Sequence, residues 1–393
     1  MPEAPAGTQA FAHALEEDDT LVRIGWEDWL AMPPPYENQE FTVTEVVERY
    51  RRNGYEWDMH GSLYTPAKER GDRPAFVVFH GGGANEKVMD VTPDGRPGLA
   101  RRLAAQGFTV LTLSYPGLWP PGGEWRQPIA ERVPVYLLDT ETGEEELQDR
   151  LLKCTFNVIL QGAGQLTDRH LQGRRLITFG HSTGGPMASH LTRFTREAEV
   201  IGIVGWGSGG PDGWRREWRE ATGMEAPKPY GLTQISRRTV NAYRRSHYED
   251  LPELTPWGRM EDFFRLTEKT RPQIKIGLRD NQHNVFPERL EEYVRVTGLP
   301  REEYFDHLQD PPADWLASLK VLLMVGENDH GHWIGGESLG DKREMFMAGK
   351  YQAGGANIHV GLVPKYTHMG HWALYNERIA YAWLWALKTG YFD

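Results

Sequence analysis

The chain has 393 residues, of which 39% are hydrophobic and 25% charged, and its formal net charge is −11 at pH 7. These values are ordinary for a globular protein, and the acidic balance argues against a surface that binds nucleic acid or an anionic membrane. The length exceeds that of one minimal core, which predicts a core with insertions or at most two domains. The single cysteine, Cys154, excludes an internal disulfide, and its apolar neighbours predict a place in the core rather than a nucleophile.

The first segment, residues 1–40, is acidic, contains several prolines and is apolar only locally, around Trp26 and Trp29. We expect an extension that packs on the body through these tryptophans. The segment lacks the basic start and apolar run of a signal peptide, and no later run reaches the roughly 18 apolar residues of a membrane helix. A cytoplasmic protein without a membrane or nucleic-acid partner is therefore expected.

Strand-like and helix-like segments alternate along the rest of the chain. Residues 41–50 and 55–64 are predicted to form an antiparallel hairpin that turns at Asn53-Gly54. Apolar runs that suit buried strands follow at residues 74–79, 108–113, 176–179, 200–204, 319–325 and 360–363. Segments with helical spacing lie between or after them, at residues 98–106, 144–170, 186–195 and 377–388. This alternation predicts an α/β fold with a mostly parallel sheet and helices on both faces.

One motif stands at the end of a predicted strand. Residues 180–184, Gly-His-Ser-Thr-Gly, run from the strand straight into a helical segment. In this context the pattern G-x-S-x-G predicts a sharp turn that exposes Ser182 at its tip and places the backbone N–H of Thr183 where an oxyanion would develop. With 43 glycines in the chain, a chance match is the alternative, so other parts of such a site must also appear.

A glycine loop follows the strand at residues 74–79. Its sequence, His80-Gly81-Gly82-Gly83, leaves backbone N–H groups free to point at a substrate oxygen, and we expect Gly82 and Gly83 to complete an oxyanion hole. A phosphate-binding loop is the competing interpretation. No Gly-Lys-Ser/Thr follows the glycines, which disfavours it.

A carboxylate is expected after the late strand at residues 319–325. That strand ends in Gly-Glu-Asn-Asp, and Asp329 is the preferred acid because its position on the loop lets it accept a hydrogen bond from a catalytic histidine. Glu327 and Asp212 are the alternatives.

The histidine is expected in the last loop of the chain. His371 is preferred as the base because it directly precedes Trp372 and the final amphipathic helix, and His368 is the alternative. His181, inside the serine motif, is expected to be structural.

The order of these motifs, serine, then acid, then histidine, differs from that of the chymotrypsin and subtilisin classes. On these motifs the chain resembles the serine α/β-hydrolases, over roughly residues 45–393. The resemblance implies Ser182 as nucleophile, His371 as general base, Asp329 as its orienting acid, and no cofactor. Residues 92–96, Thr-Pro-Asp-Gly-Arg, are similar to a branch of bacterial carboxylesterases in which the acid can follow the strand at residues 200–204. Trp206 occupies that position here and cannot serve as the acid, so Asp329 is expected to take this role.

The domain organisation follows from the same comparison of segments. We expect a core of residues 41–211 and 316–393, and between them a largely helical insertion of residues 212–315 that forms a cap over the site; a surface decoration is the alternative. Three tryptophans adjoin predicted site loops, namely Trp206, Trp333 and Trp372. They are expected to line a pocket for an apolar or aromatic small-molecule substrate.

Two further patterns are weaker. Residues 205–210 match G-x-G-x-x-G, but a proline follows and no acidic strand end comes about twenty residues later, which argues against dinucleotide binding. His330 and His332, next to Asp329, could ligate zinc, but a third ligand is not evident and no metal is expected.

The predicted reaction is hydrolysis of a carboxylic ester or lactone through an acyl-enzyme. The same residues would also suit an activated carbon–carbon bond, an amide, or transfer of an acyl group to an acceptor. From another class, a small-molecule receptor with a hydrolase-like pocket is the alternative, and a homo-oligomer is compatible with the sequence.

Overall fold

The computed structural model describes residues 15, 21–81, 86–92, 94–116, 149, 153–182, 184–208, 254, 290–305, 316–317, 319–329, 351–352 and 354–393. Its strands are β1 (Leu21–Arg23), β2 (Phe41–Arg52), β3 (Tyr55–Pro66), β4 (Ala75–Phe79), β5 (Val110–Ser114), β6 (Arg175–His181), β7 (Glu199–Trp206), β8 (Lys320–Asn328) and β9 (Asn357–Thr367). Its longer helices are α2 (Trp26–Ala31), α3 (Leu99–Ala105), α6 (Phe156–Leu171), α7 (Gly184–His190), α11 (Leu290–Thr297), α12 (Glu302–Phe305) and α14 (Glu377–Lys388), and three short 3₁₀ helices are η1 (Glu86–Met89), η3 (Leu191–Arg193) and η7 (Gly370–Trp372).

Within the described residues, the strands form one sheet in the order β1-β9-β8-β7-β6-β4-β5-β3-β2. All neighbours from β1 to β5 in this order are parallel, and only the β5–β3 and β3–β2 pairs are antiparallel. The predicted mostly parallel α/β sheet is therefore confirmed. Its central strands are buried along their length, which is why they appear in the sequence as unbroken apolar runs.

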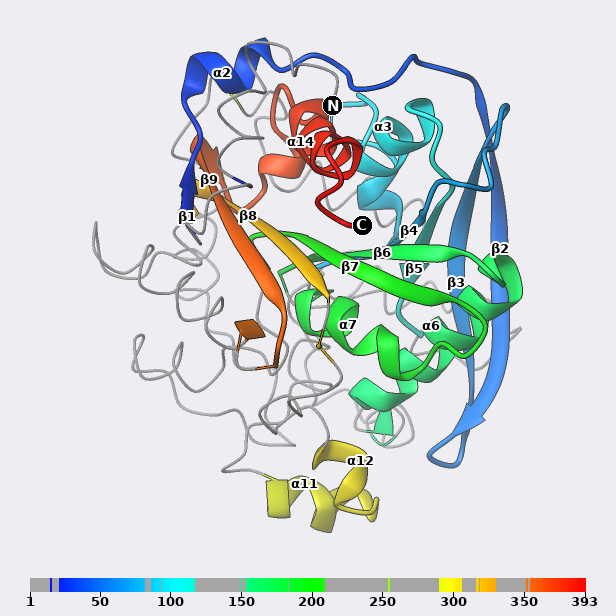
Figure 1. Cartoon of the computed structure of the whole chain (residues 1–393). Helices are drawn as coiled ribbons and strands as arrows, with labels where there is room; N and C mark the ends of the chain where they lie inside the picture. The colour runs from blue at the N-terminus through cyan, green and yellow to red at the C-terminus, as the bar shows by residue number, and fades with distance from the viewer. Residues whose placement is uncertain are drawn as a thin grey trace.

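Helices cover both faces of this sheet (Figure 1). On one face α3 and α14 pack on a core that includes Phe76, Phe179 and Trp383. On the other face α6 and α7 pack on a core that includes Val77 and Ile159, together with the buried Cys154. The alternating side chains of each strand supply the two cores, so that one sheet holds the whole described molecule together.

The predicted hairpin is present and slightly longer than expected. Strands β2 and β3 pair in an antiparallel register that joins Arg52 to Tyr55, and the two turn residues have positive φ, 52° at Asn53 and 81° at Gly54. Asn-Gly suits this turn because both residues tolerate the left-handed conformation.

Helix α6 differs from the predicted segment at residues 144–170. Asp149 and Lys153 are helical, but Cys154 and Thr155 are not, and α6 begins at Phe156. The side-chain oxygen of Thr155 accepts a hydrogen bond from the backbone N–H of Val158. This bond caps the N-terminus of α6, so a new helix starts here and the continuous helix that periodicity alone suggests is interrupted.

The early segment contributes a strand of its own. β1 lies beside β9 in parallel, with Val22 opposite Gly361, and α2 follows it. Trp29 is fully buried and its indole N–H donates to the hydroxyl of Tyr366 at 3.1 Å. The sequence predicted an extension that only packs on the body. In the structure, residues 21–31 instead add an edge strand, β1, to the sheet and a helix, α2, that packs beside it.

Most of the predicted cap, residues 212–315, lies outside the described residues. Within it, α12 is joined to the core by Glu303, whose buried carboxylate accepts two hydrogen bonds from Arg52, at 2.8 and 2.7 Å, and one from Asn53 at 2.9 Å. Within the predicted insertion, α12 therefore lies beside the tip of the β2–β3 hairpin and the start of α6, where Asn157 donates to the carbonyl of Glu303.

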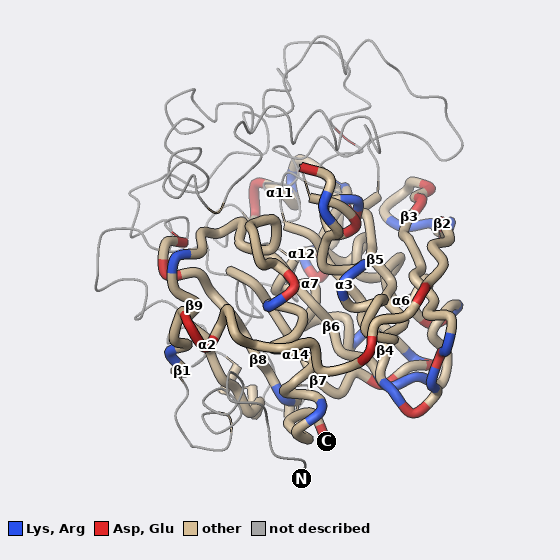
Figure 2. The backbone as a smooth tube through the Cα atoms, turned by 90° about the horizontal axis from the view of Figure 1, so that it is seen from above, with Lys and Arg blue, Asp and Glu red and all other residues tan. Residues whose placement is uncertain are grey.

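Charged residues lie mainly on the hairpin, the helices and the outer turns, whereas the central strands carry few (Figure 2). Among the described residues, no helix is both long and apolar enough to cross a bilayer.

Candidate active site

The residues singled out in the sequence follow strands that end at one edge of the sheet. β6 ends at His181, beside Trp206 at the end of β7, and β8 and β9 end with Asn328 opposite Thr367. The carboxyl ends of parallel strands meet at this edge, where α/β proteins bind ligands. Ser182, Asp329 and His368 are each the first residue after their strand, so the register brings them to the same place.

Ser182 lies in a strained turn between β6 and α7. Its φ is +52°, a left-handed conformation that a non-glycine residue adopts only when the surroundings impose it. The flanking glycines allow this turn. A Cβ atom at Gly180 would lie 2.5 Å from the carbonyl oxygen of Gly184, and one at Gly184 would lie 2.6 Å from that of Phe79. Ser182 itself is 7% exposed, so it is largely buried at the sheet edge, whereas the motif predicts a serine exposed at the tip of the turn.

Asp329 pairs with His368. Nδ1 of His368 donates to Oδ2 of Asp329 at 2.9 Å, and the two side chains are 2% and 0% exposed. Gly207, with a φ of +49°, permits this pair, because a Cβ there would lie 2.6 Å from the Asp329 carboxylate. The bond fixes the tautomer of His368 that carries a proton on Nδ1, which directs Nε2 to accept a proton from elsewhere.

His371 has different surroundings from those that the sequence suggested. Neither of its ring nitrogens has a hydrogen-bond partner among the described residues, and its ring packs on those of His181 and Trp372, with centroids 4.2 and 4.8 Å away. Burial, and then the neighbouring His368, hold the pKa of His371 well below its usual range. The expected Asp329–His371 pair is therefore corrected to Asp329–His368, the alternative considered for the base.

The backbone of His368 is held by two side chains. Its carbonyl oxygen accepts hydrogen bonds from the indole N–H of Trp206 at 3.0 Å and from Nε2–H of His181 at 3.1 Å. Burial, followed by the nearby His371 and His368, lowers the pKa of His181 well below its usual range, so its ring is neutral. His181 is therefore a structural residue that links the serine turn to the histidine loop.

Two of the tryptophans expected in a substrate pocket lie in the protein interior. Trp206 and Trp372 are 0% and 1% exposed, and the indole N–H of Trp372 donates to the carbonyl of Val88 at 3.0 Å. With no surface left for a ligand, both are corrected to packing and hydrogen-bonding residues. Trp206 was misassigned because it ends a strand at the site edge, but the strand's alternation turns its side chain into the core. Trp333 lies outside the described residues.

The glycine loop begins against the serine. A Cβ at Gly81 would lie 3.0 Å from Cβ of Ser182, so only glycine permits this approach. Gly82, Gly83 and Thr183, the expected oxyanion donors, lie outside the described residues.

Two residues at the end of β5 anchor this loop, and sequence reasoning missed both. The hydroxyl of Tyr115 donates to the carbonyl of His80 at 2.5 Å, before the glycines. After them, Ser114 bonds the buried carboxylate of Glu86 and accepts from its backbone N–H at 3.1 Å. Their only sequence signal is a polar residue and an aromatic residue directly after a buried strand.

The part of the chain that the structure describes contains no group of three or more His, Cys, Asp or Glu side chains that could hold a metal ion. His330 and His332 are outside that part.

Comparison with known proteins agrees with this geometry. The family model described as "Alpha/beta hydrolase family" matches residues 76–380, which include all three site residues and most of the sheet. The chain belongs to the alpha/beta hydrolase family. No curated protein matches this hydrolase.

Several solved structures are similar to this hydrolase at low sequence identity. Epoxide hydrolase CorEH without ligand is 15% identical with a TM-score of 0.46, over 88% of this chain and 99% of its own. VinJ is 14% identical with a TM-score of 0.48, over 90% and 98%. A thermostable esterase from Pseudomonas putida is 15% identical with a TM-score of 0.41, over 97% and 95%. Matches this distant carry no information about the reaction.

Proposed function

We propose that the protein is a serine hydrolase that cleaves a carboxylic ester or lactone through an acyl-enzyme. The observation that carries the proposal is the hydrogen-bonded Asp329–His368 pair at the sheet edge where Ser182 sits in a left-handed turn. The ring of His181, adjacent to Ser182 in the chain, has its centroid 4.6 Å from that of His368, so the serine turn and the histidine loop are in contact.

In the proposed first step, Oγ of Ser182 attacks the carbonyl carbon while Nε2 of His368 takes the hydroxyl proton. Asp329 holds the imidazole in orientation and stabilises the imidazolium that forms. The tetrahedral intermediate then collapses, and His368 returns the proton to the leaving alkoxide. Backbone N–H groups of Gly82, Gly83 and Thr183 remain the proposed donors to the oxyanion.

In the second half of the reaction, His368 takes a proton from water, which attacks the acyl carbonyl. Collapse of this intermediate releases the carboxylic acid, and the proton returns to Oγ of Ser182. These steps use only residues of this chain and water. A lactone would give a single hydroxy acid, because its alcohol and acid remain joined.

The test is labelling of the wild type and of Ser182→Ala with a fluorophosphonate probe, followed by a panel of chromogenic esters with increasing acyl size. We expect labelling of the wild type only, and a loss of kcat/KM of at least about 10⁴-fold in Ser182→Ala. A folded wild type that is neither labelled nor active on any ester would overturn the proposal.

Product analysis separates the other reactions open to these residues. Amine or ketone products would indicate an amide or carbon–carbon bond, and an ester formed only with added alcohol would indicate acyl transfer. Tight binding of a ligand without turnover would indicate a receptor.

A further inference from the structure

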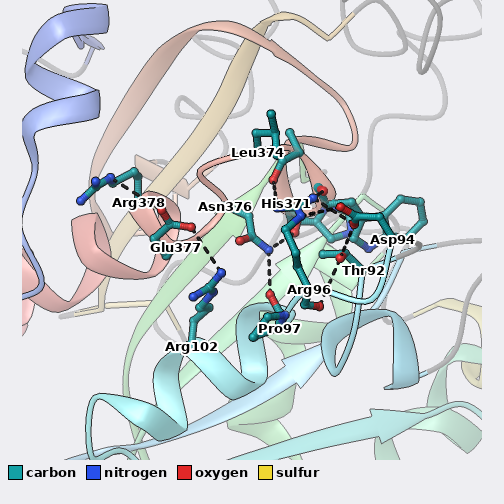
Figure 3. Close-up of polar contacts among 12 residues, drawn as sticks. Thr92, Asp94, Arg96, Pro97, Arg102, His371, Leu374, Asn376, Glu377 and Arg378 are labelled. Carbon is teal, nitrogen blue, oxygen red and sulfur yellow. Dashed lines mark hydrogen bonds and ion pairs between the residues drawn. The ribbon is translucent and has the colours of Figure 1, made fainter. Parts of the chain in front are cut away.

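The loop that contains Arg96 is far from His368 in sequence, but it binds the segment that follows His368. Nη1 and Nη2 of Arg96 donate to the carbonyl oxygens of Ala373 and Trp372, at 2.9 and 2.7 Å. Nδ2 of Asn376 donates to the carbonyl of His371, at 3.1 Å. Three consecutive carbonyls, those of residues 371–373, are thus bound by side-chain N–H groups. Figure 3 shows Arg96 and Asn376 beside His371.

Asn376 also ties this segment to the loop of Arg96. The same Nδ2 that binds His371 donates to the carbonyl of Pro97 at 3.1 Å, and the side chain of Asn376 is fully buried. The contact between residues 92–97 and 371–376 therefore has three side-chain donors on backbone acceptors.

Arg96 is itself fixed before it reaches these carbonyls. The carboxylate of Asp94 accepts from its Nε at 2.6 Å and from its Nη2 at 3.1 Å, and Thr92 Oγ1 donates to the same carboxylate at 2.6 Å. Burial alone would raise the pKa of Asp94, but the hydrogen bonds from Arg96 and Thr92 outweigh it and the pKa is lowered. The guanidinium is therefore presented as a rigid, charged fork.

The bound segment is connected stiffly to His368. The 3₁₀ helix η7 covers residues 370–372, and the backbone N–H of Trp372 donates to the carbonyl of Met369 at 2.8 Å. At the start of this turn, the carbonyl of His368 accepts hydrogen bonds from Trp206 and His181. A displacement of residues 371–373 would therefore pass to His368 through one tight turn.

We propose that Arg96 is a positioning residue, which keeps His368 in line with Asp329 by holding the backbone of residues 372 and 373. This inference rests on the proposed function, because it gives His368 the role of base. Arg96 is not one of the three proposed catalytic residues, Ser182, His368 and Asp329, and it acts on His368 only through the backbone. A shift of about 1 Å in a catalytic group can cost on the order of 10²-fold in rate, so a modest loosening is measurable.

The experiment compares Arg96→Ala, Arg96→Lys and the control Arg101→Ala. Arg101 also pairs with an aspartate, Asp90 at 2.7 Å, and its described hydrogen bonds all go to that side chain. We expect Arg96→Ala to lower kcat by about 10- to 100-fold with KM changed by less than about twofold, and Arg96→Lys to lie between, since an ammonium cannot reproduce the planar fork. Arg101→Ala is expected to stay within about twofold of the wild type.

A second measurement does not need turnover. The proton on Nδ1 of His368 that bonds Asp329 is expected to give a low-field NMR resonance, to be assigned by its loss in Asp329→Asn. We expect it to shift or broaden in Arg96→Ala and to stay in place in Arg101→Ala. An unchanged resonance in Arg96→Ala would overturn the inference. If the resonance shifts but the wild type neither labels nor hydrolyses esters, the inference on position holds and the proposed function fails.

Discussion

His368 and His371 lie three residues apart and are both buried, but their contacts differ in kind. His368 bonds a carboxylate through its ring and two side chains through its carbonyl oxygen. His371 packs between aromatic rings, and its lowered pKa keeps it uncharged. Only the first arrangement can stabilise the imidazolium that a general base becomes.

A matched pair of variants tests this difference. Replacement of His368 by Gln is expected to lower kcat/KM by at least about 10³-fold, because the glutamine amide cannot accept the serine proton at neutral pH. The same change at His371 is expected to cost less than about tenfold. Chromogenic ester hydrolysis and the rate of fluorophosphonate labelling provide the measurement. The reverse order of losses would restore His371 as the base.

Local sequence patterns predicted Ser182 and Asp329 but preferred His371 to its alternative His368, because strand β9 is longer than its apolar run. The run suggests a strand of residues 360–363, whereas β9 continues to Thr367 despite Pro364. The continuation includes Lys365 at a φ of +67° and a shift of register against β8. This irregularity sets His368 opposite Asp329, and no pattern in one sequence reveals it.

At the scale of elements, the end of β5 holds both ends of the glycine loop. Tyr115 binds the carbonyl before the glycines, and Ser114 binds Glu86 after them. An oxyanion hole depends on donors that are fixed before the reaction, so in the proposed reaction we expect these anchors to affect the rate through the loop.

We expect Tyr115→Phe and Ser114→Ala each to lower kcat by about tenfold, since a looser loop places its N–H groups less well. Ser114→Ala should also reduce the free energy of unfolding, by about 1–3 kcal/mol, because it leaves the buried Glu86 carboxylate short of a donor. Steady-state kinetics and denaturant unfolding check both.

The controls for the loop anchors are two hydroxyl groups that bond backbone carbonyls away from the glycine loop. Thr112→Val, on the same strand, removes a hydroxyl that donates to the carbonyl of Ser62 at 3.3 Å, and Tyr391→Phe removes one that donates to that of Val321 at 2.8 Å. An equal loss of kcat in these controls would contradict a specific role of Ser114 and Tyr115 in the site.

At the scale of the whole molecule, the sheet buries two neutral histidines. His181 lies at the end of β6 and His371 in the loop after β9, and both have lowered pKa values because of burial. The unfolded chain exposes them to water, where an imidazole has a pKa of about 6.5.

This difference predicts acid sensitivity. Above about pH 6.5 the two residues are neutral in both states and contribute no pH dependence. As the pH falls below that value, the unfolded chain takes up about two protons that the native state excludes, so the free energy of unfolding decreases. Urea unfolding between pH 7.5 and 5.5 measures this proton uptake, and His371→Gln should reduce it by about one proton. An identical slope in the variant would show that His371 is protonated in the folded state.

The central strands of the sheet could be predicted from the sequence more readily than its edge strand β1. Unbroken apolar runs predicted the central strands, since burial on both faces leaves no room for polar residues. β1 has only three residues, and its pairing with β9 depends on contacts more than 300 positions away, such as the 337 that separate Trp29 from Tyr366. Such distant pairing carries no local signal.

That pairing also orders events during synthesis. β1 leaves the ribosome before its neighbour β9, with more than three hundred residues between them, so the nascent chain carries an unpaired strand and an uncovered Trp29 until β9 emerges. His368 directly follows β9, so the proposed base emerges just after the strand that pairs with β1. A partly made chain would hold Ser182 without His368, so under the proposed function we expect no hydrolysis until β9 has joined the sheet.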